Sequence, residues 1–443
     1  MDVTPWYGGA TVNATVTNKT SKALSSWQVS LPWAAGVSSV WSGVNHSSGS
    51  NVVVSNESWN GQLAAGGSTT FGMTITYPSP TNPTGCTATT SNGSGSCTVN
   101  SGTVTAPPTP TPTDSGTPTP TPTTPTPTPT IVPPAPLPAD FKLAPYVDMG
   151  GWPVPDLTAY RNATGISTFS LAFITSAGGC TPAWGGYPTL AINNTSDSQL
   201  QAIDASIANL RAGGGDALIS FGGANGTEIA QSCTSVSSLQ AAYQAVIDKY
   251  KLTRIDFDIE GGAQGDHAAN IRRSQAIAAI QANMAAAGKQ LTVTYTLPVL
   301  QTGLTADGLG VLHDAVTGGM RTDLVNVMAM DYGGAVPQMG QAAIDAGNNT
   351  ANQISFLYPS LTTAQRLSRV GITAMIGEND IANEQFTIQN AAQVRDWIRA
   401  NGVGLLAWWE VGRDRSCDGG IPTYACSGTS NAQWAYAKEF TKA

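Results

Sequence analysis

Residues 107–138 are almost entirely proline and threonine, and a run of this kind cannot contribute to a folded core. Proline lacks a backbone N–H and fixes φ, so we expect this segment to be extended. At ~3.1 Å per residue, it can hold its neighbours on the order of 100 Å apart. The chain of 443 residues is therefore predicted to contain two modules, at residues 1–105 and 140–443, joined by a linker at 106–139.

The composition limits the partners that the chain can have. Only 11% of the residues are charged, and the net charge is −8. No basic run occurs, so nucleic acid is not an expected partner. No apolar run approaches the length of about 18 residues that spans a bilayer, so we expect no membrane contact. A weakly charged, acidic surface suits a neutral polymer, and we expect a monomer.

Six cysteines point to an oxidising compartment. They are Cys86, Cys97, Cys180, Cys233, Cys417 and Cys426. None forms a CxxC pair and the chain has only three histidines, so no metal site is expected. The close pairs 86/97 and 417/426 predict disulfides and hence a secreted protein, with free thiols in a cytosolic protein as the alternative. The sequence starts without a signal peptide, which we attribute to a missing N-terminal segment.

Residues 1–105 have the pattern of an all-β module. Short alternating segments rich in β-branched residues, such as 10–17 and 70–77, are separated by Gly, Asn and Ser turns. No helical periodicity competes, so we predict a β-sandwich. The module has five tryptophans, at positions 6, 27, 33, 41 and 59. One small core seldom needs so many, so some are expected to form a binding surface.

The segments TPWYGGATVNATVTN, SSWQVSLPW and SWNGQLAAGGSTTFGM resemble the family 2 carbohydrate-binding modules. The resemblance implies that Trp27 is buried. It also implies that Trp6, Trp41 and Trp59 form a flat strip that stacks on sugar rings. The apolar C–H faces of a pyranose suit this role because stacking on indole needs no charge. The implied ligand is chitin or a related N-acetylglucosamine polymer, with cellulose as the alternative.

From residue 140 onward, short apolar runs alternate with amphipathic helical patterns. Several of the helical patterns open with Ser, Thr or Asp and close at Gly. Eight such units in about 300 residues predict a (β/α)8 TIM barrel. An open doubly wound sheet is the alternative, but no GxGxxG follows the first run. The predicted strands are 142–149, 167–174, 216–223, 254–260, 290–298, 323–332, 371–377 and 404–410.

One predicted strand carries three carboxylic acids on a single face. The sequence TRIDFDIEGG places Asp256, Asp258 and Glu260 at alternate positions, with apolar residues between them. Three like charges in a low-dielectric interior cannot all ionise, so at least one acid keeps a proton at neutral pH. Perturbed carboxyls of this kind are typical of catalytic acids. Arg254 has the same parity and could pair with one of them.

The second module resembles the family 18 glycoside hydrolases, the chitinases. Their DxxDxDxE signature matches residues 253–260, although Thr253 replaces the first Asp. Their SxGG motif on strand three matches Ser220, Gly222 and Gly223, which would then bind substrate. A tight turn is the alternative explanation for this glycine pair.

Two further matches lie on strands six and eight. The family's MxYD motif matches MDYG, with Tyr332 at the Tyr position and Gly in place of the last Asp. An alternative register puts Met330 at the Tyr position and Asp331 at the Asp position, but alternation along the strand favours Tyr332. Trp408 matches the tryptophan beneath the cleaved sugar, with core packing as its alternative role. Asp331 and Asp380, which follows the seventh run, would also contact the substrate.

The resemblance implies substrate-assisted retaining catalysis through an oxazolinium ion, without a metal or cofactor. Glu260 would protonate the leaving oxygen and later activate water. Asp258 would orient the acetamido group and share a proton with Asp256. Tyr332 would donate to the acetamido oxygen, and Trp408 would stack beneath the ring.

Three classes of function remain open at this point. The first is a chitinase that cleaves β-1,4 linkages while the N-terminal module holds it on insoluble polysaccharide. The second is an endo-β-N-acetylglucosaminidase acting on glycans, for which a tether suited to an insoluble surface is less useful. The third is a catalytically weak chitin-binding lectin, against which the presence of Glu260 argues.

Overall fold

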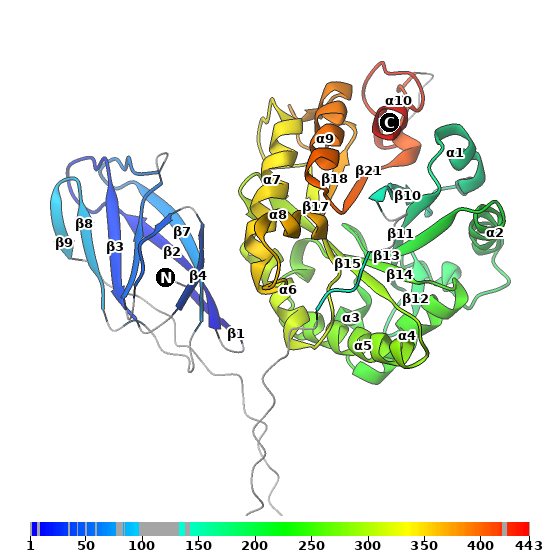
Figure 1. The fold of residues 1–443 in the computed structure, drawn as a ribbon, viewed down its shortest axis with the longest axis horizontal. Helices are drawn as coiled ribbons and strands as arrows, with labels where there is room; N and C mark the ends of the chain where they lie inside the picture. The colour runs from blue at the N-terminus through cyan, green and yellow to red at the C-terminus, as the bar shows by residue number, and fades with distance from the viewer. Residues whose placement is uncertain are drawn as a thin grey trace, which may run out of the picture. The chain divides into compact units, whose positions relative to one another are not determined.

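The computed structural model describes residues 2–6, 9–33, 36–41, 43–48, 51–57, 60–76, 83, 85–96, 133–137, 142–418 and 423–442. Trp59, Cys97 and most of the predicted linker lie outside these residues. The chain divides into two compact units, Met1–Pro127 and Thr128–Ala443. Figure 1 shows a β-structure in the first unit and a barrel surrounded by helices in the second.

The first unit contains two antiparallel sheets, as the all-β prediction requires. One sheet has the strand order β1-β2-β7-β4 and the other β5-β6-β3-β8-β9 (Figure 1). The strands are β1 (Asp2–Trp6), β2 (Gly9–Thr17), β3 (Trp27–Pro32), β4 (Gly36–Trp41), β5 (Val44–Asn45), β6 (Asn51–Ser55), β7 (Ser68–Thr76), β8 (Thr87–Thr90) and β9 (Gly93–Ser96).

Apolar side chains from both sheets form the core of this unit. Phe71 and Met73 come from one sheet, and Trp27 and Val54 come from the other. The ring of Trp27 stacks on that of Phe71 with the centroids 5.5 Å apart. Its Nε1–H donates to the carbonyl oxygen of Asn60 at 3.0 Å, so its one polar group is satisfied. The burial expected for Trp27 is therefore observed.

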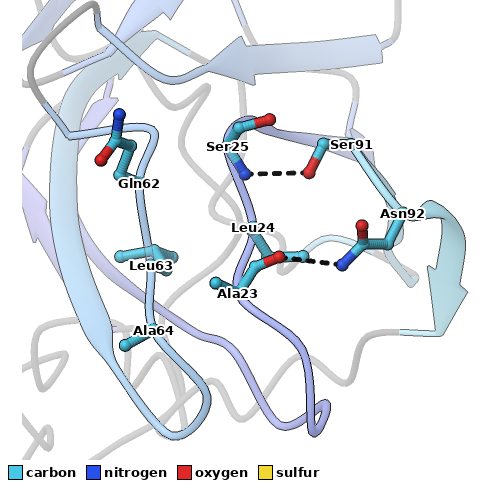
Figure 2. Close-up of a pocket in the computed structure, with 8 residues that line it drawn as sticks. All are labelled: Ala23, Leu24, Ser25, Gln62, Leu63, Ala64, Ser91 and Asn92. Carbon is cyan, nitrogen blue, oxygen red and sulfur yellow. Dashed lines mark hydrogen bonds between the residues drawn. The ribbon is translucent and has the colours of Figure 1, made fainter.

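A shallow hollow of about 660 Å³ lies between segments 23–25, 62–64 and 91–92 of the first unit (Figure 2). The backbones of Leu24 and Leu63 exchange two hydrogen bonds across it, and two side-chain hydrogen bonds join segments 23–25 and 91–92. The Ser25 amide donates to Ser91 Oγ at 2.9 Å, and Asn92 Nδ2 donates to the Ala23 carbonyl at 3.1 Å. The lining has no titratable and no aromatic side chain, so it lacks the groups that would stack on a sugar or catalyse a reaction.

The second unit is a (β/α)8 barrel with parallel strands at the eight predicted positions. The strand order is β10-β11-β13-β14-β15-β17-β18-β21, and the Leu143–Leu406 bridge joins the last strand to the first. The barrel strands are β10 (Tyr146–Asp148), β11 (Thr168–Ser176), β13 (Asp216–Gly222), β14 (Arg254–Asp258), β15 (Thr292–Leu300), β17 (Leu324–Ala329), β18 (Val370–Met375) and β21 (Leu405–Trp409). Short strands extend the rim: β12 (Pro182–Trp184), β16 (Gly303–Leu304), β19 (Gly377–Glu378) and β20 (Gln385–Phe386).

Helices cover the outside of the barrel (Figure 1). They are α1 (Leu157–Thr164), α2 (Ser198–Ala212), α3 (Ile229–Ser232), α4 (Val236–Lys249), α5 (His267–Ala286), α6 (Ala306–Thr317), α7 (Met339–Gln353), α8 (Thr363–Arg366), α9 (Ile388–Asn401) and α10 (Ala435–Thr441). The predicted boundary residues act as caps. The Asp197 side chain accepts the amides of Gln199 and Leu200 at the start of α2. Gly402 ends α9 with φ 66°, a conformation that favours glycine.

Residues 133–137 pack on the barrel, although they are rich in proline like the linker before them. The Ala135 amide donates to Asp323 Oδ1 at 2.9 Å, and its carbonyl accepts from Arg369 at 2.7 Å. Leu137 packs against the apolar cluster inside the barrel. Asp323 precedes β17, and Arg369 precedes β18, so this segment lies at the N-terminal ends of the strands. The barrel module therefore starts earlier than the predicted boundary at residue 140.

The disulfides agree with the secretion hypothesis. Cys417 pairs with Cys426, as the spacing predicts, and Cys180 pairs with Cys233. Cys86 is also disulfide-bonded. None of the described helices is long and apolar enough to cross a membrane.

Candidate active site

The three predicted acids lie together at the mouth of the barrel. Asp256 and Asp258 are on β14, and Glu260 follows two residues later. Asp256 is 1% exposed and Asp258 is 3% exposed. Ile255 and Phe257 alternate with the acids along β14 and belong to the hydrophobic core on the other face of the strand. The acids follow the strand towards its C-terminal end, where barrel enzymes place their active sites.

Three hydroxyl groups surround Asp256, the deepest acid. Ser220 Oγ and Tyr146 OH donate to its Oδ2 at 2.6 and 2.9 Å. Thr296 Oγ1 donates to its Oδ1 at 2.8 Å. Burial raises the pKa of Asp256 to about 6, and these three hydrogen bonds oppose that rise because they favour the ionised form. The polar interior of the barrel therefore holds this carboxylate in a fixed orientation.

A hydrogen bond joins the carboxyl groups of Asp258 and Glu260, and the pKa of each is raised. Burial is the main cause for both acids. The charges of Glu260 and Asp256 raise the pKa of Asp258 further, and so does the hydrogen bond. The same bond lowers the pKa of Glu260, so Asp258 is the donor. Asp258 is thus hydrogen-bonded to Glu260, and its sharing of a proton with Asp256 stays a prediction.

The glycines of the SxGG match allow β13 to approach the end of β14. Gly222 has φ 105°, and a Cβ there would lie 2.0 Å from the Asp258 carbonyl oxygen. Gly223 has φ 89°, and a Cβ there would lie 2.7 Å from the ring of Phe173. The amide of Gly223 donates to the Asp258 carbonyl at 2.9 Å. These glycines therefore shape the site through their backbone, beyond the tight turn that any glycine pair suggests.

A cavity of about 380 Å³ contains two of the three acids. It lies between the loops that follow β13 and β14. It is lined by Gly222, Gly223, Ala224, Gly226, Glu228, Gln231, Asp258, Glu260, Gly261, Gly262 and Ala263. Within the described ranges, no group of three or more His, Cys, Asp or Glu residues is arranged to hold a metal ion.

The tryptophan beside the acids is Trp409, so the role predicted for Trp408 is wrong. Trp408 is 0% exposed, and its ring stacks on Phe440 of α10 with the centroids 4.7 Å apart. Trp409 stacks on Phe173 at 5.6 Å and lies 6.0 Å from the ring of Tyr146, which binds Asp256. Core packing, the alternative for Trp408, is what the structure has.

Tyr332 has no recorded interaction with the three acids among the described residues, so its predicted role stays a prediction. In the described part of the chain its hydroxyl is buried without a hydrogen-bond partner. Burial raises its pKa, and the charges that act on it are those of Glu384 and of Asp345 on α7. The side-chain alternation of β17 does not continue to Tyr332, because Asp331 adopts φ 49° after the strand ends. This break favours the alternative register, with Met330 at the Tyr position, which stays a prediction.

Asp331 is the residue of this segment that acts on the acid pair. Its charge raises the pKa of Glu260. Its own Oδ1 accepts the amide of Ile381 at 2.9 Å, which fixes the carboxylate at the rim. Burial raises the pKa of Asp331, the Ile381 hydrogen bond lowers it, and the charge of Asp380 raises it. Asp380 is exposed on the loop after β19, and its charge acts on Asp331 and on Arg413.

Comparisons with known proteins give the same two modules. Residues 2–95 match the family model described as a cellulose binding domain. A probable bifunctional chitinase/lysozyme from Escherichia coli (strain K12) is 36% identical over 282 residues, 61% of this chain and 30% of that protein. Endochitinase 11 from Metarhizium anisopliae is 34% identical over 280 residues, 61% of this chain and 52% of that protein. The chain thus spans about half or less of the length of these curated relatives.

The solved catalytic domain of a hyperthermophilic chitinase from Pyrococcus furiosus is 31% identical, with a TM-score of 0.59. The match covers 69% of this chain and 95% of that domain. The chain belongs to the family 18 glycoside hydrolases. The predicted family is thereby confirmed for the barrel, and the match at residues 2–95 confirms the carbohydrate-binding module of the hydrolase.

Two of the predicted strip positions lie on strands of the first sheet of the hydrolase. Trp6 is on β1 and Trp41 is on β4. Through the strands between them, they align with Thr76 and Gly72 of β7. Phe71, Met73 and Ile75 of β7 are part of the core, and the strip itself stays a prediction. The third strip residue, Trp59, is outside the described residues.

The sequence alone does not identify four residues of the hydrolase's site, which are Tyr146, Phe173, Thr296 and Trp409. Tyr146 and Thr296 are polar residues inside apolar runs, and a buried hydroxyl needs a partner, which is a usable signal. Trp409 has the parity of Leu405 and Ala407, which line the barrel interior. Phe173 carries no signal of its own, since any apolar run offers such a residue.

Proposed function

We propose that this chain is a secreted chitinase that cleaves β-1,4 linkages between N-acetylglucosamine units by substrate-assisted retaining catalysis. The observation that carries the proposal is the buried, hydrogen-bonded pair of Asp258 and Glu260, both with raised pKa. A carboxyl that stays protonated near neutral pH is what a general acid requires. The names of the two curated relatives, a chitinase/lysozyme and an endochitinase, support the substrate class.

In the first step, Glu260 gives its proton to the glycosidic oxygen as the bond from that oxygen to the anomeric carbon breaks. The acetamido oxygen of the same sugar attacks the anomeric carbon and forms a cyclic oxazolinium ion. Intramolecular attack of this kind gains from proximity, because no second reactant must be ordered. Glu260 keeps its own proton for this step. Asp258 passes its proton to Asp256, releases Glu260 and, as a carboxylate, accepts a hydrogen bond from the acetamido N–H, which aligns the nucleophile.

In the second step, the Glu260 carboxylate takes a proton from water, and the water oxygen attacks the anomeric carbon. The bond to the acetamido oxygen breaks, so the sugar keeps its original configuration and Glu260 regains its proton. Asp258 as a carboxylate stabilises the positive charge of the oxazolinium. Asp256 can accept the proton that Asp258 loses, since its pKa of about 6 lies close to neutral.

Two residues are proposed to position the donor sugar. Trp409 would lie beneath the ring, with Phe173 stacked behind it. Asp331, which follows β17, would contact the sugar and keep the pKa of Glu260 high. The backbones of Gly222 and Gly223 would leave room for the chain beside Glu260.

The first module is proposed to hold the enzyme on insoluble polysaccharide through Trp6, Trp41 and Trp59. The family model at residues 2–95 is described as cellulose-binding, so cellulose and chitin are both tested as its ligand. The three disulfide-bonded regions support a secreted location.

The test is the release of soluble sugars from crystalline chitin by the full chain, with Glu260→Gln as the control. The glutamine is nearly isosteric but cannot donate an acidic proton, so turnover should fall at least about 100-fold while the fold is retained. Residual activity above about a tenth of wild type would remove Glu260 from its role. Cello-oligosaccharides, which lack the acetamido group, should not be cleaved. Release from peptidoglycan but not from chitin would assign a different polymer.

A further inference from the structure

The cavity beside Glu260 is lined by the segment from the end of β13 to α3 and by the loop after β14. Its walls join Asp258 and Glu260 to Gln231. We propose that this cavity is the subsite for the leaving group, and that Gln231 determines specificity by binding the first sugar on that side. The inference rests on the proposed function, because it takes Glu260 as the acid that protonates the leaving oxygen.

The strand order sets the direction of the sugar chain. In the barrel, β21 lies four strands from β14 in either direction, so Trp409 and Glu260 face each other across the mouth. A donor sugar that lies over Trp409 and reaches Asp258 therefore fills this mouth. The scissile oxygen at Glu260 is then at the β14 edge. The sugar beyond that oxygen continues outward, into the cavity between the β13 and β14 loops.

The lining of the cavity suits a neutral, hydroxyl-rich ligand. Gly222, Gly226 and Gly261 have no side chains, so a ring can approach the backbone closely. Gln231 offers an amide that both donates and accepts, as a sugar hydroxyl or acetamido group requires. In the described part of the chain this amide has no hydrogen-bond partner. It is therefore free to bind a ligand.

Glu228, a charged residue that lines the cavity, already has hydrogen-bond partners. Glu228 Oε1 accepts from Tyr243 OH at 2.6 Å. Its Oε2 accepts from the Ala230 amide at 2.9 Å and from Arg273 at 3.2 Å. With both oxygens occupied and its charge paired, Glu228 supports the wall and leaves Gln231 as the polar group that faces the ligand.

The short helix α3, which carries Gln231, is held at both ends. Glu228 caps its first turn through the Ala230 amide. Cys233, directly after it, is bonded to Cys180, and its carbonyl accepts from Arg272 at 2.9 Å. Arg272 also donates to the Ala230 carbonyl. A side chain on such a supported element can bind a ligand without a large ordering cost.

The experiment compares two substrates with the same donor and different leaving groups. One is the N-acetylglucosamine tetrasaccharide, whose leaving group is a sugar. The other is the nitrophenyl glycoside of the disaccharide, whose leaving group is an aryl alcohol with no sugar hydroxyls. Gln231→Ala should lower kcat/KM on the tetrasaccharide roughly tenfold, the scale of one or two lost neutral hydrogen bonds. On the aryl glycoside it should change kcat/KM less than about twofold.

Gln201→Ala is the matched control, because Gln201 is an exposed glutamine on α2 and does not line the cavity. It should alter neither substrate. Equal losses on both substrates, or no loss on the tetrasaccharide, would overturn the assignment of Gln231. If the wild-type chain cleaves neither substrate, the proposed function itself fails, so the two failures are distinguishable. Gln231 is partly exposed, and an unchanged thermal midpoint verifies that the variant folds.

Discussion

The hydroxyl group of Ser220 donates to Oδ2 of Asp256 at 2.6 Å, the shortest of the three hydrogen bonds that this buried carboxylate accepts. The three bonds favour the ionised form, and burial opposes them. Removing one bond must therefore raise the pKa of Asp256 above its value of about 6.

We expect Ser220→Ala to move the acidic limb of the kcat/KM profile to higher pH, because Asp256 then accepts the Asp258 proton only at higher pH. The shift should be about one to two pH units, the scale of one hydrogen bond to a charged group. Ser170→Ala is the control, since that buried hydroxyl donates to the Ala144 carbonyl at 2.9 Å instead. Identical profiles for the two variants would show that Ser220 does not tune the acid.

The two adjacent tryptophans on β21 should respond differently to truncation. Trp408→Ala removes a fully buried ring from its stack on Phe440 and should cost about 3–5 kcal/mol of unfolding free energy. Trp409→Ala should cost less stability but lower kcat/KM on chito-oligosaccharides about tenfold, the worth of a good aromatic contact. Denaturant unfolding and initial rates measure the two effects. A stable, inactive Trp408→Ala enzyme would reverse the assignment of the two residues.

Strand alternation predicts side-chain positions well only where a strand is regular. It places Asp256 and Asp258 correctly because β14 is regular throughout its length. It fails at Tyr332, since the left-handed conformation of Asp331 cannot be read from an ordinary Met-Asp-Tyr sequence. For the Trp-Trp pair, a motif match selects either residue, and only the register of β21 decides which one faces inward.

The start of the barrel module shows a different limit. Pro-Pro-Ala-Pro-Leu at 133–137 is rich in proline like the linker before it, so composition predicts an extended tether. The contacts of Ala135 and Leu137 depend on Asp323, Arg369 and the open end of the barrel, which are far away in the sequence. A segment of this kind can be recognised only once the tertiary structure is known.

The pH dependence of the reaction should respond to Asp331. Its negative charge raises the pKa of Glu260, in addition to the larger effect of burial. The protonated acid is the active form, so activity is lost as pH rises through the Glu260 pKa. Asp331→Asn removes the charge, lowers that pKa and should move the alkaline limb of kcat/KM to lower pH. Asp380→Asn is the control, and a shift equal to that of Asp331→Asn would contradict this assignment.

The segment that closes the barrel should matter for stability and not for turnover. A barrel that starts at Thr128 keeps the contacts of Ala135 and Leu137, whereas one that starts at Ala139 loses them. We expect the shorter form to lose up to about 2 kcal/mol of unfolding free energy, because Leu137 is partly buried and about 2 kcal/mol is the low end for a fully buried leucine. Leu137→Ala in the longer form should reproduce most of that loss. Equal stability of both barrels would make 133–137 part of the tether after all.

The first module should matter only for insoluble substrates. The barrel from Thr128 should turn over soluble chito-oligosaccharides at the rate of the full chain, because 133–137 lies at the strand ends opposite the acids. On crystalline chitin it should be slower, since the first module raises the effective concentration at the surface. Trp6→Ala and Trp41→Ala in the full chain should give the same surface defect, whereas Trp27→Ala should unfold the module by removing its stack on Phe71. Equal rates on crystalline chitin for the barrel and the full chain would exclude anchoring to that polymer, and binding assays on cellulose would then identify the ligand.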